Sequence, residues 1–169
     1  FHHLKVDYKD GKKWELAKPD YVELKNLFKT WQEGAQAGNG WNALFWCNHD
    51  QPRIVSRMGN EGKYWKESAK MLAGAVHLMQ GTPYIYQGEE LGMTNAHFTS
   101  IDQYRDVESL NYYEILLSEG KTKEEALQTL AERSRDNSRT PMQWNATENA
   151  GFSESTPWIQ VEDNYRQIN

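Results

Sequence analysis

The sequence has little of what several classes of protein require. Its 169 residues include one cysteine, Cys47, so no disulfide can form within the chain and a disulfide-stapled secreted scaffold is excluded. No apolar run approaches the roughly 20 residues that cross a bilayer. Lysine and arginine number 19 against 24 acidic residues, and this net charge of -5 disfavours a general nucleic-acid binder. We therefore expect a cytoplasmic protein that binds neither membranes nor nucleic acids.

Short motifs for metals and cofactors are also missing. The sequence has no cysteine pair, no P-loop, no serine nucleophile elbow and no glycine fingerprint between a strand and a helix. His2 and His3 are adjacent, and on a strand they would face opposite sides, which argues against a shared metal ion. We expect no metal site and no cofactor.

What the sequence does contain is ordinary for a globular protein, with 38% hydrophobic and 25% charged residues. The chain begins at Phe1 without an initiator methionine and ends in a polar stretch at Asn169. We expect it to be a piece of a longer protein.

Strand and helix patterns alternate along the first half of the chain. We expect a strand over 1–7, a turn, and a helix that begins at Pro19-Asp20 and ends before 38–40. A strand over 42–47, covered on both faces, a helix over 64–80 and a strand over 84–86 follow. This order predicts parallel βαβ crossovers, hence an α/β fold. An eight-stranded (β/α)8 barrel typically needs about 250 residues, so the chain could supply only part of one; a doubly wound sheet is the alternative.

The second half of the chain lacks this alternation of strands and helices. We expect helices over 102–119 and after the capping box Thr122–Glu125, and then a charge-rich functional loop over 135–141. Trp31 and Trp46 are expected in the core.

Polar clusters follow two of the expected strands, where parallel α/β folds carry reactive groups. Asn48-His49-Asp50 could bind sugar hydroxyls or stabilise a positive charge, although Asn48 and Asp50 could equally cap the next helix. Glu89 and Glu90 are adjacent, point opposite ways in an extended chain and are expected to bond backbone amides nearby.

Two basic groups have both a functional and an ordinary interpretation. Lysines 5, 12 and 13 could receive a phosphate, but an ordinary charged turn is the simpler account. Arg135 and Arg139 could hold a carboxylate by two-point contacts, or they could form surface ion pairs of little value.

Three long segments, 42–53, 80–93 and 134–144, resemble signatures of the α-amylase family (glycoside hydrolase family 13) in its oligosaccharide α-glucosidase branch. Segments 1–8, 45–53 and 104–111 are most similar to those enzymes of this branch that cleave the α-1,1 linkage of trehalose 6-phosphate to glucose and glucose 6-phosphate. They are almost as similar to the enzymes of the branch that cleave α-1,6 glucosides.

The resemblance implies a retaining glycosidase on a (β/α)8 barrel, with a nucleophile and an acid roughly 5 Å apart. Residues 1–169 would be a fragment of the catalytic barrel, about strands 6 to 8 with their helices, without the N-terminal half of the barrel and without the C-terminal β domain. The motifs that carry the nucleophilic aspartate and the general-acid glutamate are missing. We therefore expect the isolated chain to be inactive, and to self-associate through its open strand edges.

The resemblance also assigns roles around the cleaved glucosyl unit. Asp50 would be the third carboxylate, which holds the sugar's hydroxyls and favours its positively charged transition state. His49 would hydrogen-bond the same sugar, and Arg139 would bind it and order the acidic cluster.

For the leaving group, Glu108 is a weaker candidate, and Lys5 and Lys13 become plausible phosphate ligands. The expected partner is thus a small carbohydrate, possibly phosphorylated. A non-catalytic carbohydrate-binding or scaffolding piece is the alternative from another class.

Overall fold

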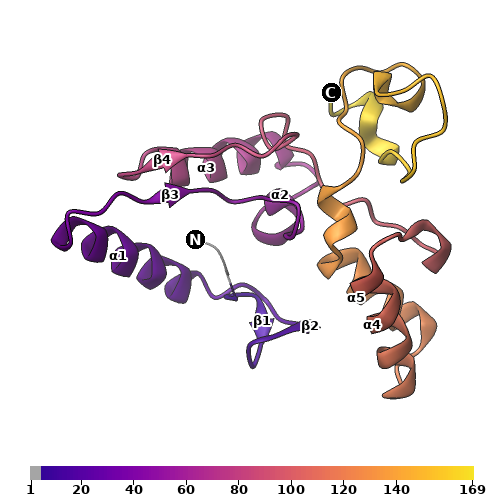
Figure 1. Ribbon diagram of the computed structural model, residues 1–169, viewed down its shortest axis with the longest axis horizontal. Coiled ribbons are helices and arrows are strands. Elements are labelled where there is room, and N and C mark those ends of the chain that lie inside the picture. Colours follow the sequence, from indigo (N-terminus) through magenta and orange to yellow (C-terminus); the bar gives the residue numbers. More distant parts are fainter. Residues whose placement is uncertain (1–4) are drawn as a thin grey trace.

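The computed structural model describes residues 5–169, and Figure 1 shows their arrangement. The elements are a hairpin of β1 (Tyr8–Lys9) and β2 (Lys12–Leu16), α1 (Tyr21–Ala37), β3 (Ala43–Leu44), α2 (Ile54–Met58), α3 (Trp65–His77), β4 (Thr82–Pro83), α4 (Val107–Ser118) and α5 (Lys123–Arg133). Short 3-10 turns are η1 (Ile101–Gln103), η2 (Arg135–Ser138), η3 (Glu148–Gly151) and η4 (Asp163–Arg166).

One parallel βαβ unit confirms the predicted α/β class. β3 pairs in parallel with β4, and α2 and α3 lie on the connection between them. The two predicted strands are shorter than expected. Of 42–47 only Ala43–Leu44 is strand, and the second strand is Thr82–Pro83 rather than 84–86. The amide of Tyr84 still donates to the Leu44 carbonyl at 2.7 Å, so the chain stays extended beyond the ladder.

The first predicted strand is wrong where it can be compared. Residues 1–4, including His2 and His3, lie outside the described residues, and 5–7 are irregular and turn. Pairing starts only at Tyr8, in an antiparallel hairpin. The predicted turn is present at Asp10 (φ 51°) and Gly11 (φ 74°), whose positive φ angles suit the sharp reversal of a hairpin.

The helix α1 follows its sequence signals closely at its start. Asp20 caps it, because its carboxylate accepts from the amides of Val22 and Glu23 at 2.9 Å each. Leu24 is buried in the core, but Trp31 is 54% exposed, which corrects the prediction for that residue. The apolar stripe of α1, formed by Leu24, Leu27, Phe28 and Trp31, is only partly covered, because Leu27 and Phe28 pack against the core around β3 while Trp31 stays open to solvent.

The helices of the second half are confirmed with one change. The capping box at Thr122 opens α5 as predicted. The helix expected over 102–119 is interrupted, because Tyr104 and Asp106 have extended backbone angles and α4 begins only after Asp106. This interruption leaves the Asp106 carboxylate at the N-cap of α4.

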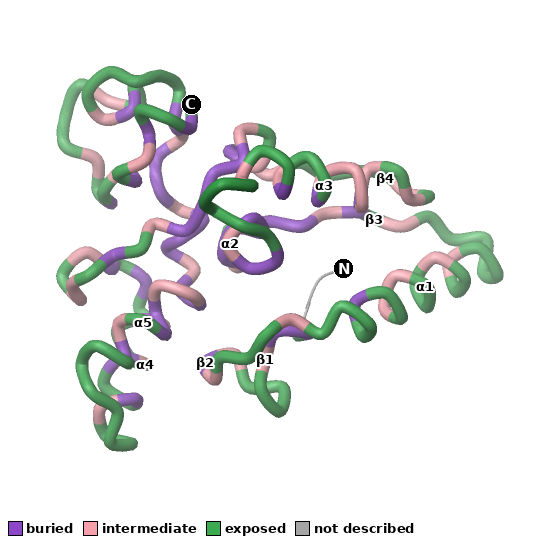
Figure 2. Tube along the Cα trace, turned by 180° about the vertical axis from the view of Figure 1, so that it is seen from behind, coloured by how far each residue is buried: buried purple, intermediate pink, exposed green. Residues whose placement is uncertain are grey.

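Residues 5–169 contain two apolar cores, and the buried residues are concentrated where the central segments meet (Figure 2). The first core lies around β3, α2 and α3 and consists of Val6, Leu24, Leu44, Trp46, Cys47, Ile54, Val55, Met58, Leu72 and Val76. The second lies around α4 and α5 and consists of Trp14, Phe98, Tyr104, Tyr113, Leu116, Ala126, Leu130 and Ile159. Trp46 belongs to the first core as predicted, and its indole N–H donates to the Leu72 carbonyl at 2.7 Å.

Only one face of the strand pair is covered, which corrects the expectation of a strand buried on both faces. Leu44 is fully buried, whereas Tyr84 and Ile85 are 58% and 55% exposed. The uncovered side carries a hollow of about 410 Å³ lined by Ala43, Phe45, Cys47, Asn48, Tyr84, Ile85 and Tyr86. Within residues 5–169, no helix combines the length and the apolar character needed to cross a membrane.

Candidate active site

A cluster of charged side chains lies where the two cores meet. Asp50 and His49 follow β3 of the first core, and Glu108 lies in the first turn of α4 of the second core. Arg135 is the first residue of η2, and Arg139 directly follows this turn. Of the residues predicted from the sequence, the structure therefore brings together Asp50, His49, Arg139 and Glu108.

The position of Asp50 is set by a tight turn. Asn48 accepts a hydrogen bond from the amide of Asp50 at 2.8 Å, an Asx turn that ends the extended chain after β3. Asn48 and Asp50 therefore do not cap the next helix, which was the alternative prediction. The helix α2 starts later, at Ile54, and its N-cap residue Arg53 makes no side-chain hydrogen bond to the first turn. The turn directs the carboxylate of Asp50 towards the arginines.

Two arginines hold one oxygen of Asp50 and leave the carboxylate accessible. Oδ1 lies 3.2 Å from Nη2 of Arg139 and 3.4 Å from Nη1 of Arg135. Oδ2 lies 3.3 Å from Nε2 of His49. The Asp50 side chain nevertheless remains 46% exposed and that of His49 69% exposed, so a ligand can reach both.

Each arginine is itself fixed by a further acceptor, which is buried only for Arg135. Arg135 makes a two-point contact with Asp106, at 2.9 Å from Nε and 2.6 Å from Nη2. Arg139 donates from Nε to the carbonyl of His49 at 2.9 Å. Only 2% of the Asp106 side chain is exposed, against 27% for Arg135. Asp106 was not predicted as a site residue, because it lies inside the helix expected over 102–119, and only the observed start of α4 at Val107 makes it an N-cap.

The charge states of this pair follow from their contact. Burial alone would raise the pKa of Asp106, but the hydrogen bonds and charge of Arg135 outweigh it and lower the pKa overall. The same hydrogen bonds hold the pKa of Arg135 above its usual value. Both groups are therefore charged at neutral pH.

Glu108 connects the arginine cluster to the hairpin. Its Oε2 lies 3.1 Å from Nε of Arg135 and 2.7 Å from Nζ of Lys13. Trp14, next to Lys13 in β2, stacks on Tyr112 of α4 with ring centroids 4.6 Å apart, which holds the hairpin against that helix. Lys13 is thus at the edge of the cluster. Lys5 is exposed, and among residues 5–169 no hydrogen bond or ion pair joins its side chain to the site.

The segment around η2 is buried rather than a solvated surface loop. Asp136, Asn137 and Ser138 are all 0% exposed. Ser134 caps the turn by accepting from the amide of Asp136 at 3.1 Å, and the hydroxyl of Ser138 donates to the carbonyl of Gln51. The alternative interpretation of Arg135 and Arg139 as members of surface ion pairs on a solvated loop is therefore wrong, because the backbone between them is buried.

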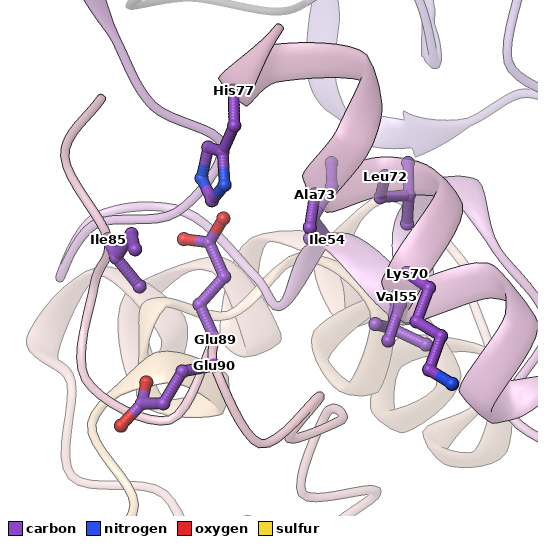
Figure 3. Close-up of a pocket in the computed structure, with 10 residues that line it drawn as sticks. Ile54, Val55, Lys70, Leu72, Ala73, His77, Ile85, Glu89 and Glu90 are labelled. Carbon is purple, nitrogen blue, oxygen red and sulfur yellow. The ribbon is translucent and has the colours of Figure 1, made fainter. Parts of the chain in front are cut away.

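A second hollow, of about 180 Å³, lies between α3 and the turn after β4 and contains none of the predicted site residues. Figure 3 shows the imidazole of His77 and the carboxylate of Glu89 pointing towards each other, with Glu90 and Lys70 pointing elsewhere. Glu89 Oε2 accepts from the amide of Tyr86 at 3.4 Å, which confirms the structural role predicted for it. Burial raises the pKa of Glu89.

The arrangement around Asp50 suits the binding of a neutral, hydroxyl-rich molecule. An ionised carboxylate accepts hydrogen bonds only, and the arginines keep one of its oxygens engaged while the other faces His49. A carboxylate fixed in this way also stabilises a positive charge that develops nearby. In the part of the chain that the structure describes, no group of three or more histidine, cysteine, aspartate or glutamate side chains is placed to hold a metal ion.

Comparisons with known proteins agree along the whole chain. The model of the alpha-amylase catalytic domain matches residues 1–169. The sequence is 63% identical over 169 residues to the trehalose-6-phosphate hydrolase of Bacillus subtilis and 52% identical over 170 residues to the oligo-1,6-glucosidase of Parageobacillus thermoglucosidasius. Each alignment covers 100% of this chain and 30% of the relative.

The crystal structure of Bacillus licheniformis trehalose-6-phosphate hydrolase has a TM-score of 0.97 to this chain at 64% identity, over 100% of this chain and 30% of that one. The chain thus spans about 30% of the length of these relatives and is a part of their fold.

Proposed function

Because this chain belongs to the α-amylase family of (β/α)8-barrel enzymes, we propose that it is part of a retaining glycoside hydrolase that cleaves trehalose 6-phosphate to glucose and glucose 6-phosphate. The observation that carries the proposal is the half-exposed carboxylate of Asp50, which two arginines fix in the turn that follows β3. In this mechanism the other two carboxyl groups, the nucleophile and the acid, belong to parts of the complete protein outside residues 1–169.

Residues 1–169 would form about the sixth to eighth strands of the barrel with their helices. The parallel register of β3 and β4 and the crossover through α3 are the local geometry of such a barrel. The open face of this strand pair, with Tyr84 and Ile85 exposed, is the face that neighbouring strands and layers of side chains would cover in the complete barrel. Asp50 then lies at the carboxyl end of a strand, where barrel enzymes place their chemistry.

Asp50 would act on the glucosyl unit that is being transferred. Its accessible oxygen accepts from sugar hydroxyls, and its negative charge stabilises the positive charge of the transition state. His49 and Arg139 contribute further hydrogen bonds from the same rim. Because Arg135 and Arg139 fix the carboxylate before the substrate arrives, little reorganisation is needed during the reaction.

The choice of a phosphorylated substrate rests on the hairpin and on similarity. Lys13 lies 2.7 Å from Glu108, so its ammonium group stands beside the proposed leaving-group subsite. A phosphate there would compete with Glu108 for Lys13, and Lys5 is a second, exposed candidate from the same hairpin region. The identity to a trehalose-6-phosphate hydrolase is 63%, compared with 52% for an oligo-1,6-glucosidase.

Substrate competition in the complete protein tests this assignment. We expect turnover of trehalose 6-phosphate with a kcat/KM well above that for isomaltose. Lys13→Ala should raise KM for trehalose 6-phosphate by about 10-fold, because a charge-assisted hydrogen bond is worth roughly 1.5–3 kcal/mol, and leave KM for isomaltose unchanged. Lys5→Ala is tested in the same way, with Lys29→Ala on the exposed side of α1 as the control.

Three results separate the alternatives. Faster turnover of isomaltose than of trehalose 6-phosphate would favour an α-1,6-glucosidase. Unchanged KM in both lysine variants would remove them as phosphate ligands. The isolated 169-residue chain should show no turnover and should self-associate in sedimentation, whereas activity in that chain would contradict the proposed distribution of catalytic groups.

A further inference from the structure

Asp106 is a buried carboxylate that contacts both arginines of the site. It makes the two-point contact with Arg135, and its Oδ1 also lies 3.6 Å from Nη1 of Arg139. It lies behind the arginines, with 2% of its side chain exposed, while the Asp50 side chain in front of them is 46% exposed. The two guanidinium groups are therefore held between one hidden carboxylate and one accessible carboxylate.

A second set of hydrogen bonds fixes Asp106 itself. The carboxylate of Asp136 accepts from the amides of Arg105 and Asp106, at 2.7 and 2.9 Å. Asp136 of η2 thus fixes the backbone just before α4. In return, the side chain of Asp106, which lies just before α4, fixes Arg135 of η2. This reciprocal exchange makes a rigid connection between the two segments, because neither can shift without breaking buried charge-assisted hydrogen bonds.

A pair of buried hydroxyls completes the connection. Ser109 donates to Oδ2 of Asp106 at 3.3 Å, and its oxygen lies 2.7 Å from the hydroxyl of Ser134, the residue that caps η2. Ser109 and Ser134 are both 0% exposed. The Oδ2 oxygen of Asp106 therefore accepts from Ser109 as well as from Nε of Arg135, and these contacts together hold the carboxylate in one orientation.

We propose that Asp106 is a positioning residue that sets the place of Arg135 and Arg139 against Asp50. The proposal rests on the proposed function, since it assigns the hidden part of the same site. Asp106 does not touch the substrate, and it acts through Arg135 first, because that contact is the two-point one. A shift of the arginines displaces the Asp50 carboxylate, and a displacement of about 1 Å can reduce a rate by about 100-fold.

Asp106 also caps α4 by accepting from the amide of Glu108 at 3.3 Å, and a test has to separate the two roles. Asparagine is as good an N-cap residue as aspartate, so Asp106→Asn preserves the cap and removes the charge that the arginines need. A residue that acted only as a cap would tolerate this change.

The decisive experiment uses the complete protein with p-nitrophenyl α-glucoside and trehalose 6-phosphate as substrates. For Asp106→Asn we expect kcat to fall by about 10- to 100-fold on both substrates, with KM changed by less than about 3-fold. Glu114→Gln, on an exposed position of the same helix α4, is the matched control and should leave both constants unchanged. Wild-type kcat for Asp106→Asn would overturn the proposal.

A double-mutant cycle then asks whether Asp106 acts through Arg135. The variant with both Asp106→Asn and Arg135→Gln should be no slower than Arg135→Gln alone, because the positioning effect has already been lost. Fully multiplicative losses would contradict the proposal. If Asp106→Asn does not fold, Arg135→Lys decides instead: it keeps a charge and loses the two-point contact, so undiminished kcat would equally overturn the assignment.

A crystal structure of Asp106→Asn supplies a readout that does not depend on the reaction. We expect the Arg135 guanidinium to move beyond roughly 4 Å from Oδ1 of Asp50, the usual limit of an ion pair. An unmoved arginine would overturn the positioning role. If instead the unmodified protein cleaves neither substrate, the proposed function fails while this structural prediction can still succeed.

Discussion

One cluster of an aspartate and two arginines around Asp7 and another around Asp50 differ in burial. In the first, Asp7 contacts Arg57 and Arg133. In the second, Asp50 contacts Arg135 and Arg139. The side chain of Asp7 is 2% exposed and that of Asp50 is 46% exposed. The same two residue types therefore form an interior connection in one place and an accessible surface in the other.

The buried cluster has its carboxylate fully engaged. Arg57 donates to both oxygens of Asp7, at 3.1 Å from Nε and 2.7 Å from Nη2, and Arg133 contacts Oδ2 and the Asp7 carbonyl. The cluster joins the segment before β1 to α2 and α5. Burial would raise the pKa of Asp7, but hydrogen bonds and charges from the arginines lower it overall.

The accessible cluster retains an oxygen that faces only a solvent-exposed histidine. This difference shows that an Asp–Arg–Arg combination is not by itself a sign of function. Catalytic use requires that the carboxylate be held by its partners and still be reachable, and only Asp50 of the two satisfies both conditions. We expect substitutions in the buried cluster to affect stability and those in the accessible cluster to affect activity.

Asp7→Ala should produce the largest effect on stability. Removing the carboxylate leaves buried arginines without their main counter-charge, which costs about 3–5 kcal/mol of unfolding free energy. Denaturant unfolding of the complete protein measures it, with Asp163→Ala on exposed η4 as the control, expected within about 0.5 kcal/mol of the parent. Because the folded pKa of Asp7 is lowered, its contribution is present above the unfolded pKa near 3.9 and is lost as pH falls below it.

Asp50→Asn should show the opposite profile. We expect kcat on trehalose 6-phosphate to fall by about 100- to 1,000-fold, since a preorganised charge at the reacting sugar is lost. The midpoint of thermal unfolding should stay close to that of the parent because the side chain is half exposed. Unchanged activity would leave Asp50 without a catalytic role and favour a non-catalytic carbohydrate-binding function.

Glu162 extends the comparison to a buried carboxylate that hydrogen-bonds hydroxyls instead of arginines. Its oxygens accept from Thr140 at 2.8 Å and Thr94 at 3.4 Å, and the residue is 2% exposed. Burial raises the pKa of Glu162 to about 7, although the charge of Arg53 and the hydrogen bonds oppose the shift. Its behaviour with pH should therefore be the reverse of that of Asp7.

The expected pH dependence follows from this raised value. The folded protein keeps the proton of Glu162 over a range in which the unfolded chain loses it, so the contribution of Glu162 to stability is greatest below about pH 4.5 and declines towards pH 7. The loss attributable to Glu162 is on the order of 2–3 kcal/mol. Glu162→Gln should flatten this part of the stability curve in denaturant titrations, and an unchanged slope between pH 5 and 7 would contradict the assignment.

Local signals predicted the elements whose cause is local. Asp20 and Thr122 start α1 and α5 because each cap needs only its own side chain and the next few amides. The Asp10-Gly11 turn is equally local. The prediction that Trp31 lies in the core was wrong for a different reason. The apolar stripe of its helix is present, but whether a residue of the stripe is buried depends on what packs against it.

The family signatures led to Asp50, His49 and Arg139, and the structure brings them together. The sequence did not lead to Asp106, because its contacts come from a residue 29 positions away and from a break in what reads as one continuous helix. Spacing along a chain carries no information about such a contact until the two segments are placed.

The sequence by itself determined the alternation of strand and helix, the caps and turns, and the family to which the chain belongs, since these depend on neighbouring residues and on ordered motifs. Only the tertiary structure decided which aspartate is sealed between arginines and which stays open to a ligand. Accessibility is a property of how separate segments pack, and Asp7 and Asp50 are indistinguishable in that respect until α2, α5 and η2 take their places around them.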